Sequence, residues 1–139
     1  MSKRKPKTRC SGTLTDAGLR AKIINTLRRL SMYWKPIQEV KRSARSGRIK
    51  NPETGHLNMA VICEVCNGHI MEKDCKVDHI NPVVPTDGFN ADGSLFLGYD
   101  WNVYLENMFC EANGFQVLCK NCHQIKSNNE NEERRNGKL

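Results

Sequence analysis

Two pairs of cysteines constrain the fold of this chain more than any other feature. The first is Cys-Glu-Val-Cys at residues 63–66, and the second is Cys-Lys-Asn-Cys at residues 119–122. Two Cys-x2-Cys pairs supply four thiolates, which is the ligand set that closes a tetrahedral structural zinc site. One zinc ion would hold the two segments together although they are distant in the chain. The sequence therefore predicts a structural zinc site with the ligands Cys63, Cys66, Cys119 and Cys122.

A metal site of this kind suits the modest core that the composition allows. The chain has 139 residues, of which 38% are apolar and 6% aromatic, and its mean hydropathy is −0.63. This is enough for one small domain with an extension, which a bound metal would stabilise. The seven cysteines are odd in number, and four have ligand spacing, so they do not indicate a disulfide framework. Without a long apolar run or a leader, we expect a soluble, cytoplasmic protein.

The charges are divided unevenly along the chain. The net charge is +7, but residues 1–50 carry 15 Lys and Arg side chains against two acidic ones, whereas residues 51–139 carry seven against 13. A basic arm on a mildly acidic module is typical of a protein that grips a polyanion. The alternative is a basic tail that serves solubility. Because the basic residues continue through a helical segment, we favour a nucleic acid as the partner and expect no membrane association.

The basic half is expected to be largely helical. Thr15 can cap an amphipathic helix whose apolar positions run from Leu19 to Leu30. A shorter basic helix over residues 37–45 should end at Gly47. The expected domains are a disordered basic arm over residues 1–14, a basic helical extension over 15–50, and a zinc-binding domain over 51–139.

The second half alternates short strands with helices. Apolar or alternating residues predict the strands, and a long loop rich in Gly, Asp, Asn and Pro separates the last two. Such a loop in a compact domain is usually functional or mobile. The final helix carries His123 in its first turn. The expected elements are strands over residues 59–62, 76–80 and 115–118, a loop over 82–99, a helix capped by Asp100, and a helix over 121–134.

Three motifs occur in order around the cysteine pairs. They are Val-Asp-His-Ile-Asn-Pro at residues 77–82, Asn-Met-Phe-Cys-Glu at 107–111, and Phe-Gln-Val-Leu-Cys-Lys-Asn-Cys-His at 115–123. Over residues 59–127 the chain resembles the HNH endonucleases, and the residues of its motifs are similar to those of the bacteriophage branch. The resemblance implies an α+β fold: a small zinc-stabilised ββα-metal (HNH) domain, here with a basic helical N-terminal extension.

The resemblance also implies a role for each residue of a nuclease site. His79 would be the general base that takes a proton from the attacking water, which suits an imidazole because it titrates near neutral pH. Asp78 and His123 would hold one divalent cation, Mg²⁺, Mn²⁺ or Ni²⁺, and leave positions open for phosphate oxygens and water. There is an alternative role for each histidine. His79 could be a structural histidine, and His123 could be a further ligand of the zinc. Because four thiolates already complete a tetrahedral zinc site, the zinc does not require His123 as a ligand.

The middle Asn of the family pattern is displaced by one residue in this chain. That Asn usually stands immediately before an apolar-Gln pair, where this sequence has Gly114, and Asn113 precedes it. Asn113 could serve as the catalytic brace after a one-residue shift, aided by a positive φ at Gly114. Otherwise the side-chain brace is missing and activity would be weak.

Basic residues in both halves are candidate contacts to nucleic acid. Lys126 lies three residues after His123 on the same helix face, so it either touches a phosphate or is simply solvated. The basic helices either enter a major groove or lie on phosphates, and we favour phosphates because their Arg residues show no periodic spacing on one face. The candidate contacts are Lys126, Arg28, Arg29, Lys41, Arg42 and Arg45.

The expected function is therefore metal-dependent hydrolysis of DNA by a phage-encoded HNH endonuclease in the host cytoplasm. One alternative is a non-catalytic zinc-knuckle protein that binds DNA, and another is a phage packaging-accessory protein whose nuclease site has decayed. RNA remains open as a substrate because no residue pattern reads a 2′-hydroxyl. A homodimer and phage packaging proteins remain open as partners.

Overall fold

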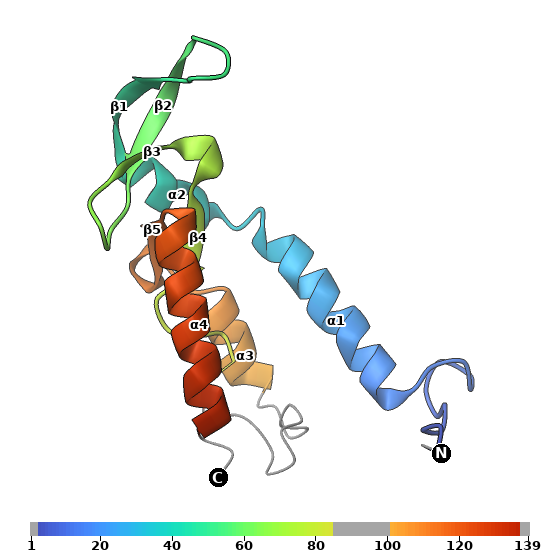
Figure 1. Ribbon diagram of the computed structural model, residues 1–139. Helices are drawn as coiled ribbons and strands as arrows, with labels where there is room; N and C mark the ends of the chain where they lie inside the picture. The colour runs from blue at the N-terminus through green and yellow to red at the C-terminus, as the bar shows by residue number, and fades with distance from the viewer. Residues whose placement is uncertain (1–2, 85–100, 137–139) are drawn as a thin grey trace. The chain divides into compact units, whose positions relative to one another are not determined.

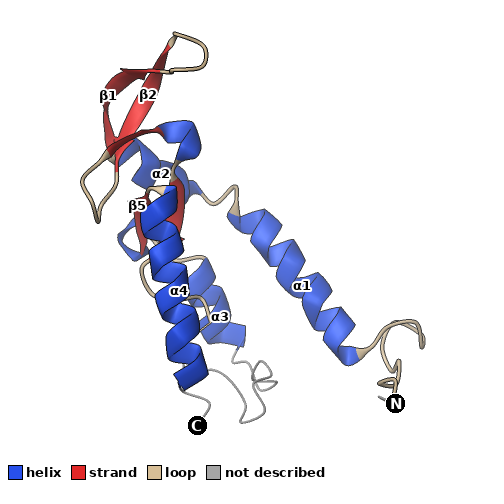
Figure 2. Cartoon of the chain, in the orientation of Figure 1, coloured by secondary structure: helices blue, strands red, loops and turns tan. Residues whose placement is uncertain are grey.

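The computed structural model describes residues 3–84 and 101–136, and this part of the chain is an α+β protein. It divides into two compact units, Met1–Trp34 and Lys35–Leu139, each described by itself. The elements, drawn in Figure 1 and coloured by type in Figure 2, are α1 (Asp16–Ser31), α2 (Lys35–Ser43), β1 (Arg45–Lys50), β2 (Leu57–Ile62), β3 (His69–Met71), the 3₁₀ helix η1 (Glu72–Asp74), β4 (Lys76–His79), α3 (Trp101–Met108), the 3₁₀ helix η2 (Ala112–Gly114), β5 (Phe115–Leu118) and α4 (Lys120–Asn136).

The first unit consists of a closed turn and helix α1. The side chain of Thr15 accepts a hydrogen bond from the backbone N–H of Gly18 at 3.0 Å, which confirms the predicted N-cap. The turn lies within the segment that we expected to be a disordered arm. Arg9 and Leu14 exchange backbone hydrogen bonds of 3.0 and 3.1 Å there, and Arg9 pairs with Asp16. Local hydrogen bonds and one ion pair therefore give residues 9–14 a defined conformation.

Two small antiparallel sheets form the frame of the second unit (Figure 1). One has the strand order β1-β2-β3, and the other pairs β4 with β5. The predicted strands over residues 76–80 and 115–118 correspond to β4 and β5, and His79 pairs with Phe115 in their register. Strand β2 matches the prediction over residues 59–62, whereas the short strand β3 was not predicted.

The predicted helical extension over residues 15–50 is helical only as far as Ser43. Residues 45–50 form β1, because the backbone carbonyl of Ala44 accepts from Ile62 N–H at 3.0 Å and the chain then pairs with β2. Gly47, which we expected to end a helix, instead lies at a bulge of this strand with φ +118°. Hairpin pairing with the next strand outweighed the local helical pattern, so the boundary lies near Trp34 rather than at residue 50.

The core of the second unit joins both sheets to helix α2. Val61 of β2, Val117 of β5 and Cys75 are buried together. The partly buried side chains packed against them are Val40, Ala44, Ile70 and Val77. Burial raises the pKa of the Cys75 thiol, which keeps it protonated and supports its reading as a small core residue.

The two faces of the β4–β5 ribbon contact different helices. Successive strand residues point to opposite faces, so Val77 and Val117 share the face that packs with α2, and Asp78 and Gln116 share the other. Helix α4 lies against this second face and contacts Asp78 (Figure 1). The Asp100 cap and most of the predicted 82–99 loop lie outside the described residues. Within the described ranges, none of the helices has the length and apolar character needed to span a membrane.

Candidate functional site

The four predicted zinc ligands lie together. The Sγ atoms of Cys63, Cys66, Cys119 and Cys122 are all within 4.8 Å of one another, and those of Cys66 and Cys119 are 3.9 Å apart. Tetrahedral zinc with bonds of ~2.3 Å requires sulfur atoms roughly 3.8 Å apart. The donors are therefore of the right type, number and spacing to hold a metal ion such as zinc.

Each cysteine pair is shaped by backbone hydrogen bonds. In the first pair, the N–H of Cys63 donates to Gly68 O and the N–H of Asn67 donates to Cys63 O, both at 2.9 Å. Asn67 takes φ +57°, the left-handed conformation that tightens this turn. In the second pair, the N–H of Cys122 points at the Cys119 sulfur at 3.4 Å. These turns direct the sulfur atoms of each pair toward one point.

The thiols of the cluster differ in acidity. Burial opposes ionisation of Cys63, but backbone N–H groups of Cys66, Cys119 and Val65 outweigh it and lower the pKa of Cys63 to about 6. Cys122 has the opposite shift: its hydrogen bond with Cys119, together with burial, raises the pKa of Cys122 to about 12. The backbone hydrogen bonds of the cluster therefore favour a thiolate at Cys63, the form that binds a metal.

A second group of possible metal ligands lies between β4 and α4. Asp78 Oδ1 and His123 Nε2 are 3.6 Å apart, and their side chains are 17% and 36% exposed. A carboxylate oxygen and an imidazole nitrogen at this separation can bind one divalent cation between them. Two ligands fill only part of its coordination shell, so water or an oxygen of a substrate could take the rest.

The other oxygen of Asp78 is already engaged. Lys126 Nζ lies 2.9 Å from Asp78 Oδ2, and Gln116 Nε2 lies 3.4 Å from the same atom. Lys126 also donates to the His79 carbonyl at 3.0 Å and pairs with Glu130. Burial alone would lower the pKa of Lys126, but its hydrogen bonds to the two carboxylates raise it. In this structure Lys126, for which we weighed a phosphate contact against a solvated side chain, pairs with Asp78.

His79 is held by its ring and by one nitrogen. Its ring lies against Phe115 with centroids 4.7 Å apart, and its Nε2 is 2.9 Å from the carbonyl oxygen of Met108 at the end of α3. A carbonyl oxygen only accepts, so Nε2 carries the proton, and Nδ1 of the neutral ring has the lone pair. His79 thus offers a basic nitrogen whose tautomer is set by the backbone.

The surroundings of Asn113 and Gly114 bear on the displaced Asn of the family pattern. Asn113 is exposed, and its side chain makes no hydrogen bond to the residues that the structure describes. Gly114 does not have the positive φ that we expected. It is required for space: a Cβ there would lie 2.5 Å from Cys110 Sγ. A side chain as large as Asn does not fit at position 114, and the His79 ring is braced by Met108 O instead.

Of the predicted nucleic-acid contacts, Lys126 lies beside Asp78, and the others lie on other elements. Arg28 and Arg29 are exposed in the last turn of α1, in the first unit. Lys41 and Arg42 are in the last turn of α2, and Arg45 begins β1.

Three contributors to the site were missed in the sequence. Glu130 lies four residues after Lys126, so helical spacing alone could have indicated it. Gln116 was detectable only through the β4–β5 register, in which it is paired with Asp78. The Met108 carbonyl carries no sequence signal, because any residue has one.

Comparison of the chain with protein-family models, with curated proteins and with solved structures finds no match. The structure itself supplies a four-cysteine cluster that could hold a metal such as zinc, and an Asp78–His123 ion pair.

Proposed function

We propose that the chain is an HNH-type endonuclease that hydrolyses DNA phosphodiester bonds with one divalent cation. The observation that carries the proposal is the Asp78–His123 pair, whose oxygen and nitrogen are 3.6 Å apart while a separate cysteine cluster is free to bind zinc. A module that only binds DNA needs no such pair. Two features support DNA as the substrate: the basic first half of the chain, and the resemblance of residues 59–127 to this family.

The chemistry divides between the bound cation and the residues of the chain. A divalent cation held by Asp78 and His123 would neutralise charge on the phosphate and stabilise the leaving oxygen. His79 Nδ1 takes a proton from water as the water oxygen attacks phosphorus and the bond from phosphorus to the 3′ oxygen breaks. The products of this hydrolysis, by resemblance, carry a 5′-phosphate and a 3′-hydroxyl. Met108 O keeps His79 in the tautomer that this step needs.

Lys126 acts in this proposal as a positioning residue. Its ammonium group and Gln116 hold Asp78 Oδ2, which leaves Oδ1 directed at His123. Hydrogen bonds to a ligating carboxylate fix its orientation in many metal sites. Glu130 balances the charge of Lys126 and holds it from the next turn of α4.

A non-catalytic zinc-knuckle protein that binds DNA is the second candidate. The observation in its favour is Asn113, which is exposed and lacks a side-chain hydrogen bond to the described residues. In that case the β4–β5–α4 unit would serve only as a scaffold, and Asp78 would be a partner of Lys126 rather than a metal ligand.

The deciding experiment is incubation of supercoiled plasmid with Mg²⁺, Mn²⁺ or Ni²⁺. The parent should nick the plasmid, a reaction without added divalent cation should not, and His79→Ala should lose about 10²- to 10⁴-fold in rate, as expected for a general base. The matched control is His56→Ala, because His56 is an exposed turn residue. If parent and His79→Ala bind the plasmid equally and neither cuts it, the DNA-binding candidate is the better one. Replacing the plasmid by RNA tests the substrate class.

A further inference from the structure

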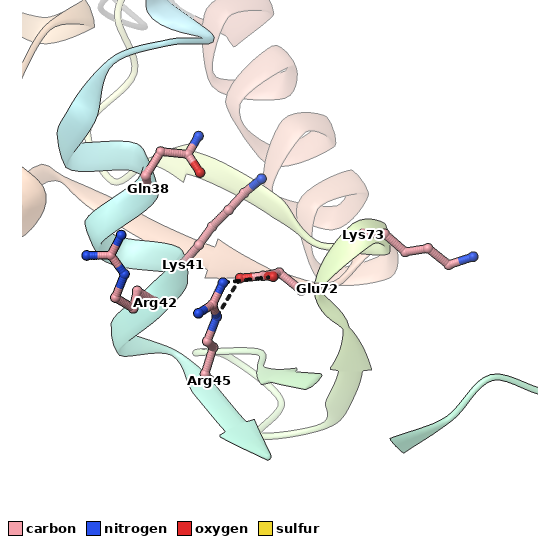
Figure 3. A pocket seen from close by; sticks show the side chains of 6 residues that line it. All are labelled: Gln38, Lys41, Arg42, Arg45, Glu72 and Lys73. Atoms are coloured by element: carbon pink, nitrogen blue, oxygen red, sulfur yellow. Dashed lines mark hydrogen bonds and ion pairs between the residues drawn. The ribbon is translucent and has the colours of Figure 1, made fainter. Parts of the chain in front are cut away.

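A basic groove lies between α2 and the 3₁₀ helix η1, away from Asp78 and His123. Its cavity has a volume of about 240 Å³. It shares no residue with the candidate catalytic site. Four of its six lining residues are cationic and one is acidic; they are Gln38, Lys41, Arg42, Arg45, Glu72 and Lys73 (Figure 3).

The acidic residue shows how an anion sits in this groove. Arg45 Nε lies 3.0 Å from Glu72 Oε1, and Arg45 Nη2 lies 3.3 Å from Glu72 Oε2 (Figure 3). This two-pronged geometry is the one in which a guanidinium binds a carboxylate or, equally well, a phosphate. The Glu72 carboxylate therefore has the position and shape of an anion bound at this point.

The Arg45–Glu72 pair can be exchanged at low cost. The Arg45 side chain is 41% exposed and that of Glu72 is 22% exposed, so water screens their attraction. Exposed ion pairs contribute only about 0 to 1 kcal/mol to stability. The pair joins the start of β1 to η1, two elements already connected through β2, so the fold does not depend on it.

We propose that the groove between α2 and η1 binds a backbone phosphate of DNA, and that this phosphate replaces Glu72 on Arg45. The proposal rests on DNA as the partner in the proposed function and names where the second unit grips it. Lys41 and Arg42 from α2 and Lys73 from η1 also line the groove and add to its positive charge, although the side chains of Arg42 and Lys73 point away from the Arg45–Glu72 pair (Figure 3). Because the groove is separate from His79, it contributes to DNA affinity and not to the hydrolytic step.

Glu72 gives the proposal a test in which removing a carboxylate strengthens binding. The measurement is the dissociation constant for a fluorescent DNA duplex over a range of salt concentrations, with no divalent cation added. Glu72→Gln should bind about two- to fivefold more tightly than the parent, because a competing charge is gone. The matched control is Glu39→Gln, which removes an exposed carboxylate of α2 outside the groove and should bind no more tightly than the parent.

Variants of the groove lysines complete the test. Lys73→Ala should weaken binding and reduce the slope of log affinity against log salt by about 1, as expected when one cation of the groove is lost. Lys35→Ala, on α2 but outside the groove, is its control. The proposal is overturned if Glu72→Gln matches Glu39→Gln, or if Lys73→Ala keeps the slope of Lys35→Ala. Because nothing is cut in this experiment, its outcome does not depend on whether the chain is a nuclease.

Discussion

The two candidate metal centres of the second unit differ in how completely the protein surrounds them. The cysteine cluster offers four sulfur atoms within 4.8 Å of one another, and Cys63 among them is fully buried. The Asp78–His123 pair offers two atoms 3.6 Å apart, and the His123 side chain is 36% exposed. A closed tetrahedral set suits a metal that holds the fold together, whereas an open set leaves room for a substrate.

The comparison also shows how each centre is supported. Tight turns within each Cys-x2-Cys pair orient the thiols, so the cluster needs little help from the rest of the fold. Asp78 depends on Lys126 and Gln116, which come from α4 and β5. If the metal of the cysteine cluster holds the fold together, loss of a cysteine should affect folding. Loss of Lys126 or Gln116 should affect only cation binding at Asp78.

The largest expected effect is that of Cys119→Ser. Losing one thiolate should release zinc and unfold the second unit, because structural zinc contributes about 10 to 16 kcal/mol of apparent binding free energy in small zinc-binding folds. Zinc content and circular dichroism measure this. Cys10→Ser, which alters an exposed thiol of the first unit, should change neither. A variant that stays folded without zinc would remove the structural role of the cluster.

Asp78→Asn should abolish activity without loss of fold. Turnover should fall at least about hundredfold, because a cation at this site would contribute several kcal/mol to the transition state. Zinc content and the unfolding midpoint should stay as in the parent. Asp74→Asn provides a carboxylate control on η1. Equal activity of Asp78→Asn and the parent would show that the catalytic cation binds elsewhere.

Lys126→Met should weaken Mn²⁺ binding by about 10- to 100-fold, as expected when a ligating carboxylate loses its hydrogen-bond partner. Titration calorimetry on the zinc-loaded protein measures the affinity. Lys126→Arg should retain part of it, and Lys120→Met on the same helix should match the parent. Tighter binding by Lys126→Met would have the opposite meaning: Lys126 would then compete with the cation for Asp78 rather than position it.

The smallest expected effect is a difference in stability between the variants Gly114→Ala and Asn113→Ala. Gly114→Ala places a Cβ 2.5 Å from Cys110 Sγ, so it should lower the free energy of unfolding by about 1 to 3 kcal/mol. Adding Cys110→Ala should recover part of this loss. Asn113→Ala, on an exposed side chain, should leave unfolding in denaturant unchanged. Equal stability of Gly114→Ala and Asn113→Ala would mean that Cys110 moves aside freely.

Local sequence patterns were sufficient for much of the second unit. Strands β4 and β5 follow from alternating and apolar runs, and α4 from the polar segment that begins within the second cysteine pair. The pairing of the two cysteine motifs followed from ligand number alone, because a single pair cannot complete a tetrahedral site. Thr15 as the cap of α1 was likewise a local prediction, and the Gly18 hydrogen bond confirms it.

Other features depended on how the chain folds back on itself. Strand β1 forms because residues 45–50 find β2 as a partner, although their basic composition continues that of the preceding helix. The need for glycine at position 114 comes from Cys110, which lies nearby only after the chain has turned through η2. In both cases the residue types do not indicate the contact, which arises only when the chain turns back on itself.

By itself, the sequence determined the chemical inventory: four thiols in ligand spacing, an Asp-His pair, a later histidine and a basic first half. Only the tertiary structure decided that Lys126 binds Asp78, that Met108 O sets the tautomer of His79, and that Arg45 pairs with the Glu72 carboxylate. The physical reason is that residue type and spacing are written in the chain, whereas the partner of a charged group or of a backbone carbonyl is set by which elements pack together.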